Sequence, residues 1–267
     1  MTPMGSTILV VPDVHLRPGQ DMSRMAALGR LAADIYSEEG ALRVVQLGDI
    51  GDFRSLSKYD RGMIGGENQR YVADCDSVRE GLELFKDAVE KEIGSRGYDS
   101  LQLHMTMGNH GPPRAERLMA EHPQLDGVFD IVSDCGIPDL GWYTYDFLQP
   151  LEIDGIAFMH YCPSGVMGRA TGGVNMARSL IRNAMQSVVV GHSHTFDMSR
   201  GTRPTGTVVQ TLSAGVFCDP DDKAFSYASK AARKMYWPGV MLLREPGSGD
   251  YDLEQLRLDR LMKKYGG

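Results

Sequence analysis

Several short apolar runs, each ending in a polar cluster, place the strongest constraint on how this chain can fold. Thr7–Pro12 is mostly apolar and is followed by Asp13 and His15. Later strand-like runs end in the same way, at Asp49, Asn109–His110, His160 and His192–His194. Ligands of α/β proteins gather at the carboxyl ends of strands, because the loops there converge on one crevice. The sequence therefore predicts an α/β fold with one polar site at its strand ends.

The first half of the chain is expected to alternate between strands and helices. Residues 21–38 carry apolar side chains at helical spacing and stop before Gly40, which is typical of a helix end. The expected elements are strands at Thr7–Pro12, Leu42–Leu47 and Leu101–Met107, helices at 21–38 and Asn68–Ile93, and a loop at Arg54–Gly66. This order predicts βαβ units and hence parallel strands.

The second half is richer in expected strands. Trp142–Leu148, Leu151–Ile153 and Ile156–His160 are predicted to be neighbours, with a hairpin turn at Asp154–Gly155. A helix at Asn175–Met185 and a strand at Ser187–Val190 follow. Three further strands are expected to complete a second sheet, at Thr207–Leu212, Val240–Arg244 and Tyr251–Leu258, and the tail Lys263–Gly267 is expected to be mobile. With no repeat or linker in view, residues 1–267 are predicted to form a single domain.

Composition limits the possible classes of protein. A chain of 267 residues can bury a core without disulfides, and its four cysteines form no CxxC pair. No apolar run approaches the ~20 residues needed to cross a bilayer, and no signal peptide is evident. These features favour reduced thiols and a cytoplasmic location. The net charge of −7 argues against broad electrostatic binding of nucleic acid, but is compatible with a local basic groove or with bound metal ions.

The residue types in the polar clusters indicate metal binding. Five of the seven histidines lie in these clusters. Imidazole mixed with carboxylate and amide ligands suits divalent transition metals, most of all manganese here, with iron, nickel or zinc as alternatives. Seven candidate ligands exceed the needs of one ion and suit two: Asp13, His15, Asp49, Asn109, His160, His192 and His194. Two metals ~3.5–4 Å apart can hold a bridging hydroxide for in-line attack at phosphorus.

Each cluster taken alone has an ordinary structural explanation. Asp13 and Asp49 could belong to simple turns, and Asn109 could cap a following helix. A lone histidine such as His160 is more often a satisfied core residue. The pair His192 and His194 is the strongest single signal, since two histidines at a strand end rarely have a packing reason. The joint occurrence at successive strand ends favours the metal-site interpretation.

Five of these segments resemble, in the same order, the motifs of the calcineurin-like metallophosphoesterases: Asp13–His15, Gly48–Asp49, Gly108–His110, His160 and Gly191–His194. The chain is more similar still to a group of small metallophosphoesterases found mainly in bacteriophage genomes. Three segments resemble features of that group: Ser55–Gly62, Gly165–Arg169 and Met235–Trp237. The resemblance implies a four-layer αββα sandwich of two mixed β-sheets flanked by helices, with the metals at one edge. It also implies a helical insertion at about 54–95.

The resemblance further implies a role for each matching residue. Two groups of three would hold one metal each, with Asp49 bridging them: Asp13, His15 and His194 for the first, and Asn109, His160 and His192 for the second. His110 would act beside the metals as a catalytic residue that stabilises the transition state or protonates the leaving oxygen. An imidazole suits that task near pH 7.

One departure from the family pattern concerns the residue after His110. Family members usually have Glu or Asp there to orient the histidine, whereas this chain has Gly111. Glu116, displaced by a short insertion, is a candidate replacement. Asp52 is either a supporting partner of the site or another turn acid.

Three arginines are candidates for binding substrate. Arg54 and Arg61 lie in the predicted loop after Asp49, and Arg169 lies in a glycine-rich segment. Each could approach a phosphate, and a solvated surface position is the alternative.

The leading hypothesis is a metal-dependent phosphodiesterase acting on a nucleotide or nucleic-acid phosphodiester, located in the host cytoplasm if phage-encoded. The preference for nucleic acid follows from the likeness to phage enzymes. A phosphomonoesterase acting on a small metabolite or phosphoprotein is the alternative. A metal-binding module without catalysis is a third hypothesis, favoured only by Gly111. The sequence leaves the oligomeric state open and allows a homo-oligomer.

Overall fold

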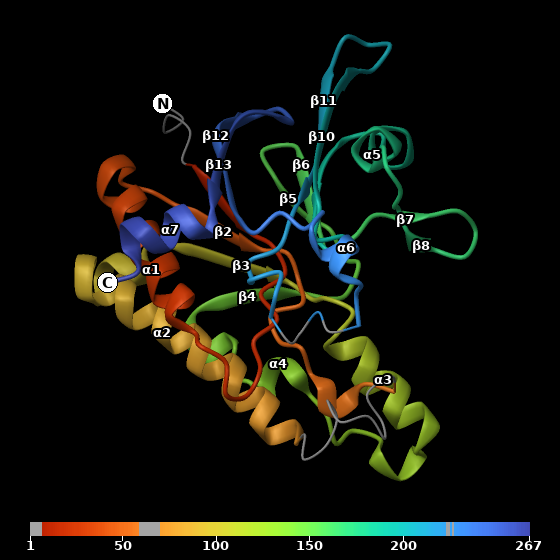
Figure 1. Cartoon of the computed structure of the whole chain (residues 1–267). Helices are drawn as coiled ribbons and strands as arrows, with labels where there is room; N and C mark the ends of the chain where they lie inside the picture. Colours follow the sequence, from red (N-terminus) through yellow and green to blue (C-terminus); the bar gives the residue numbers. More distant parts are fainter. Residues whose placement is uncertain (1–6, 59–69, 223–224, 226) are drawn as a thin grey trace.

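The computed structural model describes residues 7–58, 70–222, 225 and 227–267, and two β-sheets form its centre (Figure 1). The first sheet has the order β13-β12-β1-β2-β3-β4. Its strands are β1 (Ile8–Val11), β2 (Arg43–Gln46), β3 (Gln102–Thr106), β4 (Trp142–Tyr145), β12 (Gly239–Gly247) and β13 (Asp250–Arg257). Strands β1 to β4 run parallel, whereas β12 pairs antiparallel with both β1 and β13.

The second sheet has the order β10-β11-β9-β6-β5. Its strands are β5 (Leu151–Ile153), β6 (Ile156–Met159), β9 (Ser187–Val190), β10 (Phe196–Thr202) and β11 (Val208–Ala214). The three inner strands are parallel, and the edge strands β5 and β10 are antiparallel to their neighbours. A separate two-stranded hairpin, β7 (Pro163–Ser164) and β8 (Arg169–Ala170), projects beside this sheet (Figure 1).

The helices are α1 (Ser23–Glu39), α2 (Tyr71–Asp99), α3 (Pro112–Glu121), α4 (Ile131–Asp134), α5 (Met176–Ala184), α6 (Lys230–Arg233) and α7 (Leu258–Tyr265), with short 3₁₀ turns at Arg54–Leu56, Pro123–Leu125 and Pro138–Leu140. Helices α1, α2 and α7 cover the outer face of the first sheet and α5 that of the second, while the remaining short helices lie on connections (Figure 1). No helix in the described part of the chain is long and apolar enough to cross a membrane.

The alternation of side chains along β1 shows how the layers form. Leu9 and Val11 join the core beneath the helices of the first sheet, and Ile8 and Val10 join the core between the two sheets. On the far side, Leu180 of α5 packs against the outer face of the second sheet. The predicted sandwich of two mixed sheets flanked by helices is therefore confirmed. The single-domain assignment stays a prediction.

The sheet membership of three predicted strands was wrong. Val240–Arg244 and Tyr251–Leu258 were expected in the second sheet, but β12 and β13 extend the first. The reason is that β12 is buried on both faces: Leu242 faces the helical core and Met241 faces the second sheet. β4, expected beside β5, pairs with β3 instead. The predicted turn at Asp154–Gly155 does join β5 to β6.

The ends of several elements also differ from expectation. The tail expected to be mobile starts inside a helix: Lys263, Lys264 and Tyr265 form the last turn of α7, and the Tyr265 hydroxyl donates to Asp34. Helices α3 and α7 and strand β10 were not predicted. The expected end of the second helix at Ile93 marks a break in α2, because Gly94 has a φ of 72°. The predicted loop at Arg54–Gly66 opens with a 3₁₀ turn, and its residues 59–66 lie outside the described residues.

Candidate metal centre

The predicted polar clusters meet at one edge of the two-sheet core. Strands β1, β2 and β3 of the first sheet and β6 and β9 of the second precede them in the chain. The strands are parallel within each sheet, so their carboxyl ends share an edge. A direct contact joins the two edges, since the backbone N–H of His192 lies 3.0 Å from both oxygens of Asp13.

Asp13, His15 and His194 form the first of three groups of possible metal ligands in the described part of the chain. A further group, His15, Asp52 and His110, shares His15 with it. All three side chains are buried. Nε2 of His194 lies 3.1 Å from Oδ2 of Asp13 and 3.2 Å from Nε2 of His15. Each residue offers one ligand atom, and the three atoms lie within 4.8 Å of one another. This group could hold a metal ion.

Asp49, His160 and His192 form the second group, by the same criterion. Nε2 of His160 lies 3.4 Å from Oδ2 of Asp49 and 3.1 Å from Nδ1 of His192. The amide oxygen of Asn109 lies 2.8 Å from the same His160 nitrogen. The structure thus brings together every residue predicted as a metal ligand.

Asp49 interacts electrostatically with histidines of both groups. Burial opposes its negative charge, but His110, His160 and His15 together hold the pKa of Asp49 below its usual range. Its Oδ1 also accepts the backbone N–H of His110 at 2.8 Å. The carboxylate is therefore ionised and lies where both groups can use it.

The spacing of the ligand atoms fits bound metal. Two ligands held about 2.1 Å from one ion are separated by about 3 to 3.4 Å, as the contacts at 3.1, 3.2 and 3.4 Å are. Nitrogen donors with carboxylates suit a transition metal. Burial, followed by the charge of His160, lowers the pKa of His192 to about 4. His192 is therefore a neutral imidazole near pH 7, the form that binds metal.

The second nitrogen of His160 is held in place by the backbone. Nδ1 lies 2.8 Å from the carbonyl oxygen of Leu47, to which it can donate only if it carries the proton. This tautomer leaves Nε2 free to bind a metal. A backbone partner of this kind fixes the orientation of a ligating imidazole.

The backbone is strained at four residues of the centre. His15, Asp49, His192 and His194 all have positive φ, between 47° and 66°. Non-glycine residues adopt this region rarely and at a cost of about 1–3 kcal/mol each. Such strain persists where the surrounding structure over-determines it, commonly at functional sites. Four of the ten non-glycine residues with positive φ in the described part of the chain lie here, in agreement with a functional centre.

Glycines before two of the ligand segments permit close approach. A Cβ atom on Gly108 would lie 2.1 Å from both the backbone nitrogen and Oδ1 of Asp49. A Cβ atom on Gly191 would lie 2.2 Å from Oδ1 of Asp13. Only glycine fits at these positions, so each Gly-containing motif is needed to bring the strand ends together.

The carboxylate beside His110 is Asp52, which corrects the prediction for Glu116. Oδ1 of Asp52 lies 3.1 Å from Nδ1 of His110. Glu116 is exposed on α3, and no contact joins it to His110 in the described part of the chain. The sequence signal was Asp52 itself, three residues after Asp49 on the loop that follows β2. Oδ1 of Asp52 also lies 3.6 Å from Nδ1 of His15.

The three candidate substrate-binding arginines lie in different settings. Arg54 is close to the centre, but its Nε donates to Oδ2 of Asp52 at 2.7 Å. It therefore supports the carboxylate that holds His110. Arg169 is exposed on β8, and Arg61 lies outside the described residues. Substrate binding by these arginines stays a prediction.

Sequence reasoning missed a buried arginine that holds the first ligand loop. The guanidinium of Arg24, on α1, donates to the carbonyl oxygens of Val14 at 3.0 Å and Phe217 at 3.1 Å. Val14 lies between two candidate ligands, so Arg24 fixes the loop that carries them. A charged residue on the apolar face of a predicted helix was the available signal.

Aromatic rings border the centre and were also missed. Phe225 is fully buried and lies 5.2 Å from the ring of His15. Tyr236 lies 4.8 Å from the ring of His194, and Tyr161 lies 5.0 Å from that of His192. These rings limit the movement of the imidazoles.

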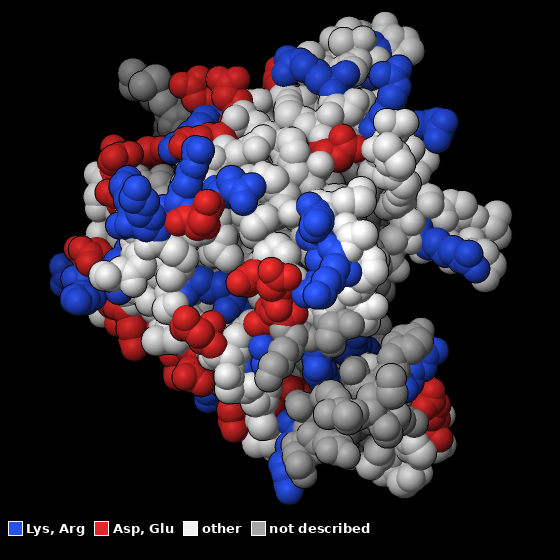
Figure 2. Space-filling model, in the orientation of Figure 1, with Lys and Arg blue, Asp and Glu red and all other residues white. Residues whose placement is uncertain are grey.

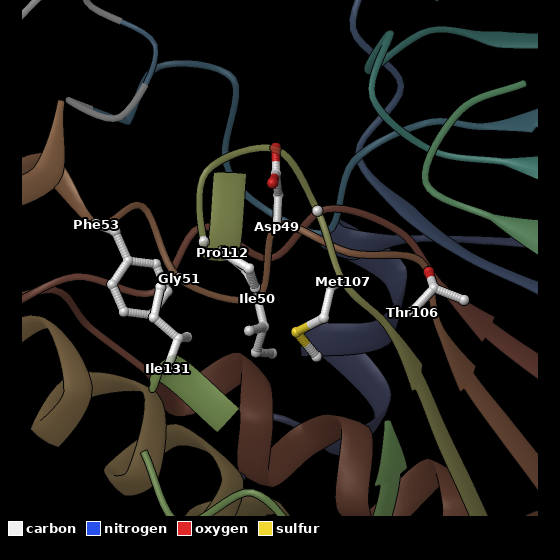
Figure 3. Close-up of a pocket in the computed structure, with 10 residues that line it drawn as sticks. Asp49, Ile50, Gly51, Phe53, Thr106, Met107, Pro112 and Ile131 are labelled. Atoms are coloured by element: carbon white, nitrogen blue, oxygen red, sulfur yellow. The ribbon is translucent and has the colours of Figure 1, made fainter. Parts of the chain in front are cut away.

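A small cavity lies beneath Asp49 (Figure 3). Its volume is about 10 Å³, and Ile50, Met107 and Ile131 contribute to its apolar lining. A cavity of this size has room for about one water, so it takes no substrate. In Figure 3 the Asp49 carboxylate points away from these side chains. The cavity is therefore part of the packing that supports Asp49.

Comparisons with known proteins give no closer assignment. No protein-family model matches this chain, and no curated protein does. The nuclease MPE of Pseudomonas putida aligns with 93% of this chain and 87% of its own at 15% identity, with a TM-score of 0.34. Another solved structure aligns with 94% of this chain and 98% of its own at 11% identity, with a TM-score of 0.37. TM-scores this low do not assign a function, which is therefore inferred from the residues of the centre.

Proposed function

We propose that this chain is a phosphoesterase that uses two divalent transition metals, of which manganese is the leading candidate. The observation that carries the proposal is the pair of adjacent ligand groups, one of Asp13, His15 and His194 and one of Asp49, His160 and His192, with His110 alongside. We assign the third possible group, His15, Asp52 and His110, no metal of its own, because Asp52 holds His110. A single structural metal would need only one such group. Two adjacent groups beside an imidazole favour hydrolysis at phosphorus.

The chain's own residues would divide the work as follows. Asp13, His15 and His194 would hold one metal, and His160, His192 and Asn109 the other, with Asp49 shared. When bound, the pair would supply Lewis acidity toward the phosphate and a more acidic water as nucleophile. The buried carboxylates would keep the two positive charges close together.

His110 would handle the proton on the leaving oxygen. Its Nδ1 is held by Asp52, while its Nε2 lies 3.8 Å from Oδ2 of Asp49 and so faces the metal groups. A ring fixed at one nitrogen can hold and transfer a proton at the other. Asp52, which accepts a hydrogen bond from Arg54, would be the positioning residue for this step.

The substrate that we favour is a phosphodiester of a nucleotide or nucleic acid. The support is the resemblance of Gly165–Arg169 and Met235–Trp237 to phage-type enzymes, which is an analogy and not a property of the site. The alternative substrate is a phosphomonoester of a small metabolite or phosphoprotein.

The decisive experiment measures bound metal and turnover in the same preparations. Purified protein loaded with manganese is expected to hold two ions per chain and to hydrolyse a bis(aryl) phosphate, with activity lost on chelation and recovered on reloading. His192→Ala should lose both metal and activity, whereas His122→Ala, outside the centre, should lose neither. Full activity in His192→Ala would overturn the assignment.

The same assay separates the alternative functions. Initial rates on a monoester and a diester with the same aryl leaving group decide between the two substrate classes. A protein that binds two metals but turns over neither ester would be a metal-binding module.

A further inference from the structure

The charges of this chain are unevenly distributed along the sequence. Residues 156–218 contain five arginines and one acid, Asp197, although the whole chain has a net charge of −7. The Asp197 carboxylate is also engaged, since it accepts the backbone N–H of Ala177 at 2.8 Å in the first turn of α5. This stretch, which supplies four of the five strands of the second sheet, is therefore basic.

Three of the five arginines line one groove on the outer side of the second sheet. The groove lies between α5 and β10 and has a volume of about 290 Å³. Its lining residues are Arg178, Ile181, Arg182, Arg200, Gly201 and Thr202. A Cβ atom on Gly201 would lie 3.4 Å from Cδ1 of Ile181. Because Gly201 has no side chain, the groove stays open between β10 and Ile181.

The charge of the groove is largely uncompensated. Arg200 is paired with both carboxylate oxygens of Asp250, at 2.6 and 2.7 Å. Arg178, Arg182 and the nearby Arg203 are exposed and form no ion pair within the described ranges of the chain. Figure 2 shows Lys and Arg side chains gathered over the part of the surface where Figure 1 places α5 and β10. Such a patch attracts polyanions.

The groove is within reach of the metal centre. Arg203 lies nine residues after His194 along the chain, and β10 is extended between them from Phe196. At 3.3–3.6 Å per residue, this separation is at most about 30 Å. Successive phosphates of one DNA strand are spaced by 3.4 Å along a duplex axis, so about nine base pairs would span it. One nucleic-acid molecule could contact both places.

We propose that Arg178, Arg182 and Arg203 bind the phosphate backbone of a nucleic-acid strand whose scissile phosphodiester lies at the metal centre. This inference rests on the proposed function and extends it to a polymeric substrate. Guanidinium groups make charge-assisted hydrogen bonds with phosphate oxygens. A concave groove between a helix and a strand fits a chain of phosphates better than it fits a flat lipid surface.

The test replaces the three unpaired arginines together. The variant Arg178→Gln/Arg182→Gln/Arg203→Gln is compared with Lys91→Gln/Arg96→Gln/Arg260→Gln, which removes three exposed cations from other helices. Binding of fluorescent single-stranded and duplex DNA of about 20 nucleotides is measured by anisotropy in chelator, across a range of salt concentrations. Hydrolysis of a bis(aryl) phosphate by the metal-loaded proteins is measured in parallel.

The groove variant is expected to bind DNA at least about 10-fold more weakly, with the slope of log affinity against log salt reduced by about 2 to 3. Both variants should hydrolyse the small diester like the wild type. Equal DNA binding by the wild type and the groove variant would overturn the proposal. An equal loss of DNA affinity in the control variant would also overturn it. So would a wild-type protein that binds phosphatidylserine vesicles but not DNA.

The two proposals fail separately. If the protein binds DNA through these arginines but hydrolyses no ester, the proposed DNA-binding groove is supported and the phosphoesterase activity is rejected. Metal-dependent hydrolysis, with DNA binding that does not depend on the three arginines, would support the phosphoesterase and reject the groove as a DNA-binding site.

Discussion

The two sheets contribute different chemistry to the centre. The first sheet supplies every carboxylate and the amide, through Asp13, Asp49 and Asn109, whereas the second supplies imidazoles alone, through His160, His192 and His194. Two of the three possible ligand groups combine residues from both sheets, whereas His15, Asp52 and His110 all follow strands of the first sheet. The two groups that we propose as metal sites therefore form only where the sheets are docked.

The two halves also differ in helical cover and in charge. α1, α2 and α7 pack on the first sheet, and α2 alone carries eight acids and four bases. The second sheet is covered by α5, in a stretch with five arginines and one acid. This contrast fits the proposed approach of an anionic substrate over the second-sheet half.

The largest effect is expected from Asp49, the first-sheet residue that both groups share. Asp49→Asn should lower kcat/KM on the small diester by about 10³-fold, because the neutral amide no longer offsets two metal charges. Bound manganese, measured by elemental analysis, should fall from two ions per chain. Asp139→Asn, on an exposed turn, is the control and should match the wild type. Two retained ions in Asp49→Asn would show that this carboxylate is not shared.

A stability comparison tests whether docking of the sheets makes the site. Phe158→Ala removes a fully buried ring from between the sheets, and Phe85→Ala removes one from between the first sheet and its helices. Each should lower the free energy of unfolding of the metal-free protein by about 3–5 kcal/mol. Only Phe158→Ala should also weaken manganese binding, as titration calorimetry would show. Equal loss of manganese affinity in both variants would contradict the shared-site interpretation.

A smaller effect separates the two carboxylates proposed to hold His110. Asp52→Asn should lower kcat by about 10- to 100-fold, because supporting partners of catalytic and ligating groups have effects of that size. Glu116→Gln should leave kcat unchanged. Steady-state kinetics at saturating manganese, with metal content checked, measures both. A larger loss in Glu116→Gln than in Asp52→Asn would restore the prediction made from the sequence.

The layered fold and the gathering of ligands were predictable, and particular residues show why. The continuous apolar run of β1, buried at every position, and the βαβ order predict parallel strands, and parallel strands place Asp13 and Asp49 at one edge. Which neighbouring strand a given strand pairs with is harder to predict from the sequence. Val240–Leu243 is a continuous apolar run that could belong to the interior of either sheet, and in the structure it pairs beside β1.

The supporting residues of the centre depend on loop geometry that sequence patterns do not specify. Asp52 reaches His110 because the loop after β2 turns at Asp49, which has a positive φ. Arg24 reaches the carbonyl of Val14 from a helix ten residues away. The roles of the ligands stay predictions, since proximity alone does not establish them.

The smallest predicted effect contrasts one histidine from each sheet in the metal-free protein. Burial, with His160, lowers the pKa of His192 to about 4 from 6.5. For His15 burial acts in the same direction, but Asp52, Asp49 and Asp13 outweigh it and raise the pKa above 6.5. Acidification from pH 6.5 to about 4 therefore costs stability at His192, because the unfolded chain binds the proton first. Stability from His15 is fully present below 6.5 and is lost as the pH rises through its folded pKa.

Urea unfolding of His192→Gln and His15→Gln, beside the wild type, measures the two contributions at pH values between about 4 and 8. As the pH falls, the stability advantage of the wild type over His192→Gln should shrink, while its advantage over His15→Gln should grow. The opposite signs follow from the different balance at each residue: three carboxylates outweigh burial at His15, whereas burial and His160 outweigh Asp13 and Asp49 at His192. Differences that change in parallel would contradict this difference in balance.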